Sequence, residues 1–317
     1  MRRFYRGNPF GRLILGIGRE VYHLYCFRMI PEKRFIQKRF KKVFGRYADL
    51  DSPHTFNEKL QWLKLNDRTP LHTLCADKYA VRQYVAEKIG TEYLVPLLYH
   101  TENPADIRPE NLPDAPFVIK TTHGSGGVML VRDKAAINWK ALRRDLRELL
   151  RANYYYESKE WPYKNIQPRI VVEKMLCTED GNIPFDYKIN CFHGKPIIIQ
   201  VDLDRFTNHK RNLYDTQWRL QPFTWCKWQD GKPLWPNGRD IPAPSQLEQM
   251  LWIARTLSSE FLYARVDLYD MMGQLFFGEI TFNHGSGRER FTPPEWDTKL
   301  GDMLILPKDK MAMKGDR

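Results

Sequence analysis

The sequence has few cysteines, and they lie far apart. Its 317 residues contain five cysteines, an odd number, with no CxxC motif and no Cys/His pair at zinc-ligand spacing. A disulfide framework or zinc module is therefore not expected, and the composition fits a reducing cytoplasm. The chain also lacks internal repeats, low-complexity tracts and any apolar run near the ~20 residues that span a bilayer. These absences exclude repeat, disulfide-scaffold and membrane-spanning classes.

A cleavable signal sequence is also not expected. The apolar stretch at residues 13–18 follows basic residues, but Arg19, Glu20 and His23 interrupt it, and no small-residue cleavage site follows. We expect a cytoplasmic protein, with a peripheral position on the inner face of the cell membrane as a further option.

Acidic residues are scarce only at the N-terminus. The formal net charge is +12, and nearly all of this excess lies in residues 1–46, where the only acids are Glu20 and Glu32. The remainder of the chain is close to neutral. Because nucleic-acid binding requires a basic patch on the folded body, this distribution argues against a nucleic-acid partner.

Residues 31–46 have the pattern of a basic amphipathic helix. Ile36, Phe40, Val43 and Phe44 recur at i, i+4, i+7 and i+8, and basic side chains fill most other positions. Such a helix can lie on an anionic membrane surface, where each Lys or Arg contributes ~1 kcal/mol. It can also dock on its own protein and leave its basic side chains in solvent. The sequence leaves both arrangements open.

The rest of the chain alternates helices and strands, which predicts a mixed α+β fold. Apolar periodicity predicts helices over residues 51–67, 74–89, 138–152 and 244–260. The Trp-rich segment 218–235 predicts a covering loop or hairpin. Strands are expected at residues 93–98, 117–120, 128–131, 170–176, 185–192, 196–203, 264–269 and 275–282.

The segment 116–128, PFVIKTTHGSGGV, is the most informative in the chain. A strand ends at Lys120, and Gly124, Gly126 and Gly127 lead into another strand. Glycines let backbone N–H groups approach phosphate oxygens, and Lys120 adds a positive charge. The spacing is not that of a P-loop, and a strand rather than a helix follows, unlike a Rossmann fingerprint. It predicts a Gly-rich turn over ATP, although an ordinary hairpin turn has the same pattern.

Two later strands carry acidic residues that suit Mg²⁺. Alternation places Arg265 and Asp267 on one face of the first strand, and Glu279 and Thr281 on one face of the next. Mg²⁺ usually binds one or two carboxylates together with substrate phosphates, so Asp267 and Glu279 are candidate ligands. A cross-strand salt-bridge set of Arg265, Asp267 and Glu279 is the alternative.

In order along the chain, these motifs resemble the ATP-grasp superfamily. They are Asp77-Lys78, expected on a helix, Lys120 with its Gly-rich loop, the EKML segment 173–176, Arg265-Val-Asp267, and Glu279. The segments TFNEKLQWLKL, DKYAVRQYV, KINCFHGKP and GEITF resemble more closely the TupA-like ATP-grasp proteins of polysaccharide and teichuronopeptide biosynthesis, over about residues 50–305.

The resemblance implies an α+β ATP-grasp fold, in which two α+β subdomains grip ATP, preceded by a basic helical N-terminal extension. The expected boundaries are 1–50 for the extension, 51–112 for a helical region, 113–305 for the ATP-grasp domain and 306–317 for a tail.

The resemblance also implies a nucleotide site. Its expected members are the phosphate-contacting Lys78, Lys120 and Lys188, the loop residues Gly124, Ser125, Gly126 and Gly127, the adenine-contacting Glu173, Lys174 and Leu176, and the ribose-binding Asp180.

For the metal, the resemblance implies Mg²⁺ on Asp267 and Glu279. Many ATP-grasp ligases have Asn two residues after the metal Glu, where this chain has Thr281, so Asn283 is the replacement candidate. Arg265 and Lys120 would be the catalytic residues, with Arg265 stabilising the transferring phosphoryl group or the tetrahedral intermediate.

The implied reaction is an ATP-dependent ligation of a carboxylate and an amine through an acylphosphate. The expected substrates are an amino acid or amine and a uronic acid-containing cell-surface polysaccharide or its precursor. Two alternatives stay open. Asp202-Leu203-Asp204 has the DxD spacing of glycosyltransferases that use nucleotide sugars. A non-catalytic ATP-binding module of a membrane-associated assembly complex would explain the basic N-terminal segment and the missing Asn.

Overall fold

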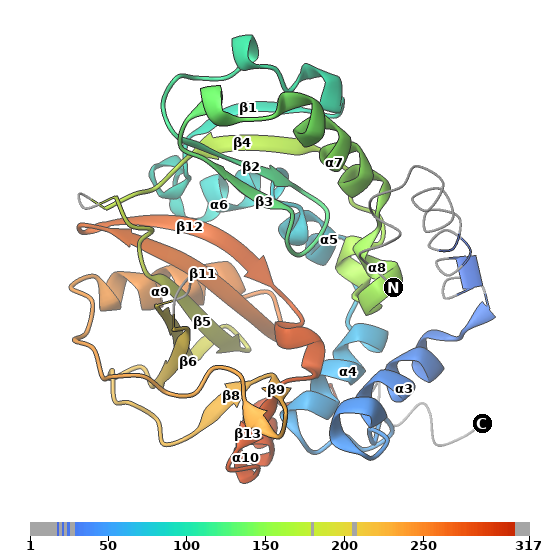
Figure 1. Ribbon diagram of the computed structural model, residues 1–317. Helices are drawn as coiled ribbons and strands as arrows, with labels where there is room; N and C mark the ends of the chain where they lie inside the picture. Colours follow the sequence, from blue (N-terminus) through green and yellow to red (C-terminus); the bar gives the residue numbers. More distant parts are fainter. Residues whose placement is uncertain are drawn as a thin grey trace.

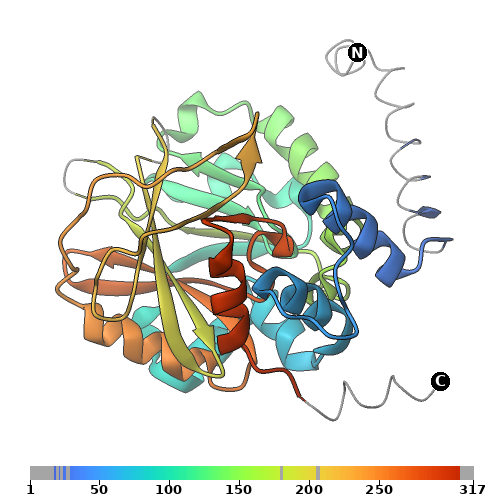
Figure 2. The same cartoon turned by 90° about the horizontal axis from the view of Figure 1, so that it is seen from below.

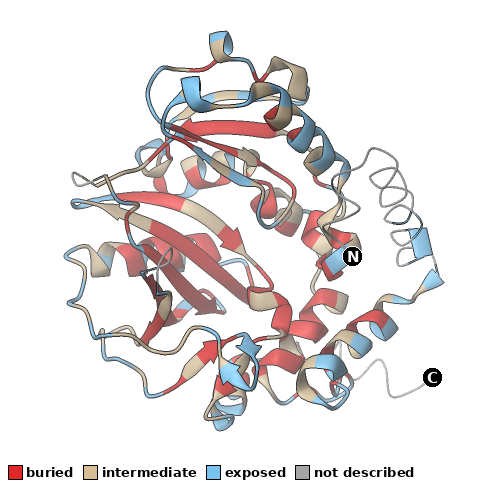
Figure 3. Ribbon diagram, viewed as in Figure 1, coloured by how far each residue is buried: buried red, intermediate tan, exposed pale blue. Residues whose placement is uncertain are grey.

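The two largest β-sheets of the described residues lie in separate layers of the molecule, with helices around them (Figure 1). The computed structural model describes residues 29–178, 181–204 and 208–307, together with Gly18, Val21, Leu24 and Tyr25. The strands of both sheets are largely buried, whereas much of helices α3 (Glu32–Phe44) and α7 (Trp139–Arg151) is exposed (Figure 3). The predicted mixed α+β architecture is confirmed.

The smaller sheet is antiparallel, with the strand order β1-β4-β2-β3. Its strands are β1 (Leu97–Thr101), β2 (Phe117–Thr121), β3 (Val128–Val131) and β4 (Ile170–Lys174). Phe117, Ile119 and Val131 lie on one face, where they pack with Leu142 and Leu146 of α7. The opposite face is therefore the one that can take part in a site.

The larger sheet is also antiparallel, with the order β12-β11-β5-β6-β7. Its strands are β5 (Asp186–Phe192), β6 (Lys195–Leu203), β7 (Lys210–Tyr214), β11 (Tyr263–Met271) and β12 (Gln274–Thr281). Ile189, Val201 and Val266 belong to its apolar face and pack in one cluster with Ile253 and Leu257 of α9 (Leu247–Ser258). Since side chains alternate along each strand, the charged residues of these strands share the other face.

Helix α4 (Phe56–Asn66) is anchored at its first turn. Thr55 and Glu58 form a capping box, in which the Thr55 side chain accepts from Glu58 N–H and the Glu58 side chain accepts from Thr55 N–H. The Phe56 ring lies 5.4 Å from Phe192 and 5.3 Å from Tyr263, centroid to centroid. These contacts fix α4 at one end of the larger sheet, beside α10 (Glu295–Met303) (Figure 2).

Helix α3 lies within the basic N-terminal segment and packs on the protein itself. Phe35, Ile36 and Phe40 are buried, and Phe40 belongs to a small cluster with Ala48 and Leu50. Of the two arrangements open for residues 31–46, the docked one therefore describes α3. Within the expected extension, residues 1–50, the structure describes Gly18, Val21, Leu24, Tyr25 and residues 29–50. Within the described part of the chain, no helix is long and apolar enough to cross a membrane.

The single helix expected over residues 74–89 is wrong. The structure has two helices, α5 (Pro70–Ala76) and α6 (Val81–Ile89). Between them the Asp77 carboxylate accepts the Tyr79 N–H at 2.9 Å, and Lys78 N–H donates to Thr122 O at 3.3 Å. Because these bonds replace helical ones, Asp77-Lys78 lies between two helices and not on one.

A further difference concerns a strand. The segment expected as a strand at 93–98 starts in the 3-10 helix η2 (Thr91–Tyr93), and the strand β1 begins only at Leu97. Strand β1 pairs with β4 of the smaller sheet. The expected domain boundary at residue 113 stays a prediction.

The other elements of the described residues are η3 (Pro104–Asp106), η4 (Pro109–Asn111), η5 (Lys134–Ala136), α8 (Tyr154–Ser158), η6 (Trp161–Tyr163), β8 (Thr224–Cys226), β9 (Trp228–Gln229), β10 (Lys232–Pro233), η7 (His284–Gly287) and β13 (Arg290–Thr292).

Gly301 of α10 lies against the start of α4 and leaves no room for a side chain. A Cβ atom there would lie 2.2 Å from His54 O and 2.9 Å from Phe56 N, both backbone atoms. We expect Gly301→Ala to lower the free energy of unfolding by roughly 1–3 kcal/mol, measured by urea denaturation. Met303→Ala, at an exposed position of the same helix, should change it by roughly 0.5 kcal/mol or less. Equal stability of the two variants would contradict this packing.

Candidate active site

Polar side chains of three neighbouring strands form a row across the larger sheet. The backbone register pairs Asp267 of β11 with Lys188 of β5 on one side and with Glu279 of β12 on the other. Arg265 lies on the same face, two residues before Asp267, and pairs with Thr281. The predicted placement of Asp267 and Glu279 on adjacent strands is confirmed.

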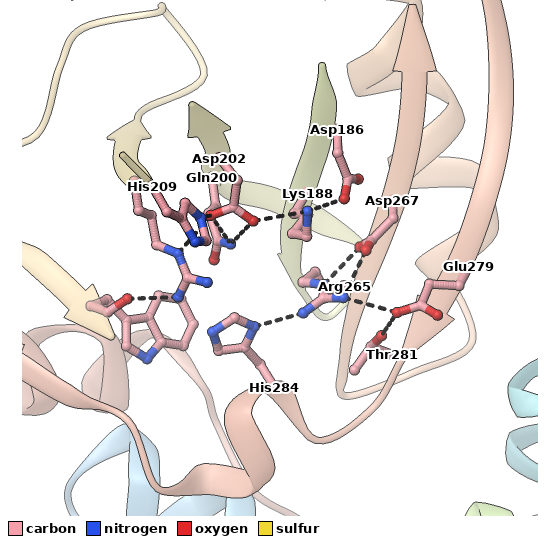
Figure 4. Close-up of polar contacts among 12 residues, drawn as sticks. Asp186, Lys188, Gln200, Asp202, His209, Arg265, Asp267, Glu279, Thr281 and His284 are labelled. Atoms are coloured by element: carbon pink, nitrogen blue, oxygen red, sulfur yellow. Dashed lines mark hydrogen bonds and ion pairs between the residues drawn. The ribbon is translucent and has the colours of Figure 1, made fainter. Parts of the chain in front are cut away.

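The guanidinium of Arg265 lies at the centre of this face. Its Nε and Nη2 donate to the two carboxylate oxygens of Asp267 at 2.6 and 2.7 Å, and Nη2 also donates to Glu279 Oε1 at 3.1 Å (Figure 4). Nη1 donates to His284 Nδ1 at 2.9 Å. Burial alone would lower the pKa of Arg265, but Asp267 and Glu279 raise it well above its ordinary value. Arg265 is therefore a fixed positive charge.

The two carboxylates differ in their electrostatics. Burial, with repulsion from Asp186 and Glu279, raises the pKa of Asp267 to about 7 despite the attraction of Arg265. In Glu279 the effect of burial is outweighed by Lys78 and Arg265, which lower its pKa to about 2. The Glu279 side chain is 38% exposed, so it is the more accessible of the two. A further positive charge between them would keep Asp267 ionised.

This donor set suits Mg²⁺. Among the described residues, no three His, Cys, Asp or Glu side chains converge to form a complete metal cage. Two carboxylates are nevertheless what Mg²⁺ takes when substrate phosphates supply the other ligands.

The Gly-rich loop joins β2 to β3 in the predicted strand-turn-strand arrangement. Its tip residues Ser125 and Gly126 are exposed. Gly127 has a φ of +69°, and a Cβ atom there would lie 2.9 Å from Thr121 Oγ1. Glycine is therefore required at 127, both for its conformation and for its space.

His123, at the base of this loop, fastens it to α7. Its Nε2 lies 2.9 Å from Ala152 O and 3.2 Å from Leu149 O, so it donates to carbonyl groups at the end of that helix. A Cβ atom at Gly124 would lie 3.4 Å from Tyr154 Cβ, so the loop also packs against α8. The loop therefore contacts both α7 and α8 near its exposed tip.

Lys78 connects this loop to the carboxylates of the larger sheet. Its Nζ donates to Gly124 O at 2.9 Å and lies 3.6 Å from Glu279 Oε2. The break between α5 and α6 is what brings Lys78 here, because its backbone N–H is bonded to Thr122 O. The Lys78 ammonium group therefore contacts residues that lie far apart in the sequence.

Lys120 lies on the face of the smaller sheet that is turned away from α7. Its Nζ lies 2.6 Å from Glu173 Oε2, and Arg82 Nη1 of α6 lies 3.2 Å from Glu173 Oε1. Val128 pairs with Lys120, and Leu130 follows on the same face. Their exposures are 50% and 42%, so this face combines a cation with open apolar surface.

Three predicted residues are placed differently from the others. Lys188 is buried and forms ion pairs with Asp186 and with Asp202, the latter at 3.1 Å (Figure 4). Asn283 lies beyond the β11–β12 ladder beside a small cavity, and its buried Oδ1 accepts no hydrogen bond within the described residues. Asp180 lies outside the described residues. The roles expected of these residues stay predictions.

The predicted adenine-contacting segment begins at the end of β4. Lys174 N–H donates to Pro96 O at 3.0 Å, and Met175 N–H donates to Pro116 O at 3.2 Å. Two backbone donors of this segment are therefore used within the protein. The contact of Glu173, Lys174 and Leu176 with adenine remains a prediction.

Asp202, the first acid of the DxD pattern, belongs to the internal charge network. It accepts from Arg211 Nε at 2.9 Å and lies 3.1 Å from Lys188 Nζ. Burial would raise the pKa of Asp202, but the His209 imidazole, 3.1 Å away, and the charges of Arg211 and Lys188 lower it far below its ordinary value. These contacts explain Asp202 without a nucleotide sugar.

Sequence reasoning missed several members of this site. Val128 and Leu130 belong to the all-apolar run Val-Met-Leu-Val, which does not indicate which face of the strand is exposed. The loop of residues 284–287 follows the strand of Glu279, which indicates polar groups at this end of the site. The contacts of His284 and Glu289 could not be predicted, because Arg265 and Arg211 lie on strands that share no fixed spacing with them.

Comparison with known proteins gives a family and a set of distant structures. The family model of TupA-like ATP-grasp proteins matches residues 58–305. No curated protein matches the sequence. D-alanine–D-alanine ligase from Bacillus anthracis complexed with ATP is 18% identical, with a TM-score of 0.41 over 73% of this chain and 64% of that chain.

Two further solved structures are similar at the same level. The ATP-grasp ligase PsnB, complexed with minimal precursor, Mg and ADP, is 14% identical, with a TM-score of 0.38 over 78% of this chain and 65% of that chain. D-alanine–D-alanine ligase from Helicobacter pylori is 14% identical, with a TM-score of 0.36 over 78% of this chain and 69% of that chain. The chain thus spans less than two thirds of the length of the first two ligases.

Proposed function

The chain belongs to the TupA-like ATP-grasp family, and from this membership we propose that it binds Mg·ATP and uses it to ligate a carboxylate to an amine. The family match covers residues 58–305 and therefore includes both sheets and every predicted site residue. The predicted ATP-grasp fold is confirmed by this match, which does not extend to residues 1–57.

The position of Lys78 is the observation that carries the proposal. Its ammonium lies between the Gly-rich loop, at Gly124 O, and the carboxylate of Glu279. Gly-rich loops bind phosphate oxygens, and paired carboxylates bind the metal that accompanies them. A nucleoside triphosphate with Mg²⁺ is the ligand that requires both groups at one place.

Each of the two sheets would contact a different part of the ligand. Lys120 and the loop tip at Ser125 and Gly126 would contact phosphates, while the open apolar surface of Val128 and Leu130 suits a purine ring. On the larger sheet, Asp267 and Glu279 would hold Mg²⁺. When bound, Mg²⁺ would neutralise charge on the phosphates and help to orient them.

The proposed reaction needs positioning and positive charge but no nucleophilic side chain. A carboxylate oxygen of the acid attacks the γ-phosphorus, the bond to the bridging oxygen breaks, and ADP and an acylphosphate result. The amine nitrogen then attacks the acyl carbon, loses a proton and expels inorganic phosphate, which leaves an amide. Arg265, a permanent cation, would stabilise the charge on the transferring group.

For the substrates, we propose a uronic acid-containing cell-surface glycan or its precursor as the acid, and an amino acid or another amine as the acceptor. The resemblance to proteins of polysaccharide and teichuronopeptide biosynthesis supports this choice of class. The exposed basic side chains of α3, such as Arg34, Lys38 and Lys42, would favour an anionic partner, such as a polyanionic glycan or the inner surface of the membrane.

A thermal-shift experiment tests the nucleotide. Mg²⁺ with a non-hydrolysable ATP analogue should stabilise the protein by roughly 2.7 kcal/mol at a concentration of 100 Kd. Lys120→Ala should reduce this shift, because it removes a phosphate-contacting cation, whereas Lys140→Ala, exposed on α7, should not. A shift with uridine-diphosphate sugars and none with the ATP analogue would refute the ligase and favour a glycosyltransferase.

A further inference from the structure

Among the described residues, one side-chain hydrogen bond of Arg265 is made to a residue that is not a proposed metal ligand. Its Nε and Nη2 are bound by Asp267 and Glu279, whose oxygens would be shared with a cation. Its Nη1 donates to His284 Nδ1 at 2.9 Å. When Mg²⁺ takes part of the charge of the two carboxylates, His284 is the partner that continues to direct the guanidinium.

The imidazole of His284 is held in one tautomer. The nitrogen facing a guanidinium must carry the lone pair, so Nδ1 is the acceptor. The opposite nitrogen, Nε2, lies 3.0 Å from Glu289 Oε2 and therefore carries the hydrogen. Glu289 Oε2 also accepts from Arg211 Nη1 at 2.9 Å, and this keeps the carboxylate ionised and in place. The ring packs on Trp225, with 4.2 Å between the centroids.

The backbone that carries His284 is fixed independently of these side chains. The short helix η7 has positive φ at Gly285, Ser286 and Gly287, a conformation that ordinary residues avoid. Helix α4 holds it there: Gln61 Nε2 donates to Ser286 O at 3.0 Å, and Lys64 Nζ donates to Ser286 Oγ at 2.7 Å. Hydrogen bonds from α4 therefore hold the backbone around His284, and the contacts with Arg265, Glu289 and Trp225 hold its ring.

We propose that His284 is a positioning residue for the reaction, and that Glu289 acts through it, so that together they aim the Arg265 guanidinium at the phosphoryl group in transfer. This inference rests on the proposed ligase function. It predicts that His284 matters little for binding ground-state nucleotide and much for binding a mimic of the transferring phosphoryl group, because Arg265 is required mainly there.

Two substitutions of His284 separate its two hydrogen bonds. The amide oxygen of Asn lies near the position of Nδ1, so His284→Asn keeps an acceptor for Arg265. The amide nitrogen of Gln lies near the position of Nε2, so His284→Gln keeps the donor to Glu289 and loses the acceptor. His54→Gln, on the exposed segment before α4, is the matched control.

The probes are Mg²⁺ with a non-hydrolysable ATP analogue, and Mg²⁺ with ADP and aluminium fluoride, which imitates the phosphoryl group in transfer. We expect His284→Gln to weaken binding of the aluminium fluoride complex roughly 10- to 100-fold. Binding of the ATP analogue should stay within about 3-fold. His284→Asn should retain most of the wild-type affinity for both, and His54→Gln all of it.

A double-mutant cycle tests the role of Glu289 without using the His284→Gln variant. Glu289→Gln should selectively weaken binding of the aluminium fluoride complex in the wild-type background but have no further effect in the His284→Asn background, because Asn has no tautomer to be fixed. Equal loss of both probes, or loss of neither, in folded variants would overturn the inference. A wild-type protein that binds neither probe would instead refute the proposed function itself.

Discussion

Replacing Glu279 with Gln is expected to remove nearly all Mg²⁺-dependent stabilisation by the ATP analogue. Glu279 is the more accessible carboxylate of the pair, and it is the one that Lys78 links to the Gly-rich loop. At a concentration that stabilises the wild type by about 2.7 kcal/mol, a variant with 100-fold weaker affinity gains only about 0.4 kcal/mol. Thermal shift with Mg²⁺ and with EDTA measures the difference.

Asp267→Asn should have the same effect, because Asp267 faces Glu279 across the two strands. The control is Asp270→Asn, on the same strand, where the carboxylate accepts the Gly273 N–H of the hairpin turn at 2.8 Å and has no part in the site. If Glu279→Gln keeps the full Mg²⁺-dependent shift, the metal lies elsewhere, and the two carboxylates serve Arg265 alone.

Replacing Asp202 with Asn is expected to lower stability more than Gly301→Ala or Asp51→Asn does. Asp202 is buried and compensates the charges of Lys188 and Arg211, at 3.1 and 2.9 Å. Removing one partner from a buried ionic network leaves charges without compensation and typically costs about 3–5 kcal/mol. Urea denaturation of the variant, at neutral pH, measures the change in the free energy of unfolding.

An exposed ion pair provides the comparison. Asp51 lies 3.2 Å from Lys33, and its side chain is 74% exposed. Asp51→Asn should change the free energy of unfolding by less than about 1 kcal/mol, because solvent screens the pair. Similar losses in the two variants would mean that Asp202 is as well solvated in solution as Asp51.

The same network has a consequence for stability at low pH. Burial alone would raise the pKa of Glu289, but the imidazole of His284 and the charge of Arg211 lower it from an ordinary 4.5 to about 2. A carboxylate whose pKa is lower in the folded state stabilises that state above its unfolded pKa. This contribution, about 3 kcal/mol, is fully present above pH 4.5 and is lost as the pH falls toward 2.

The sequence by itself determined the local structure and much of the chemistry. The Gly-rich segment between two strands can be predicted from residues that are neighbours in the chain. The same is true of the alternation that puts Arg265 and Asp267 on one face. The expected strand at 128–131 matches β3 residue for residue. Backbone geometry and the two-residue period of strands are properties of short segments, so a short segment suffices to predict them.

Only the tertiary structure decided which of these segments meet. The break at Asp77-Lys78 forms because Lys78 N–H bonds to Thr122 O, and it delivers the ammonium to Gly124 and Glu279. The docking of α3 was one of two arrangements that its amphipathic pattern allowed.

The link from Arg265 through His284 to Glu289 had no signature at all in the sequence. Periodicity fixes the direction in which a side chain points, but not what it meets. Partners are selected when two faces are brought together and every buried charge must find compensation there.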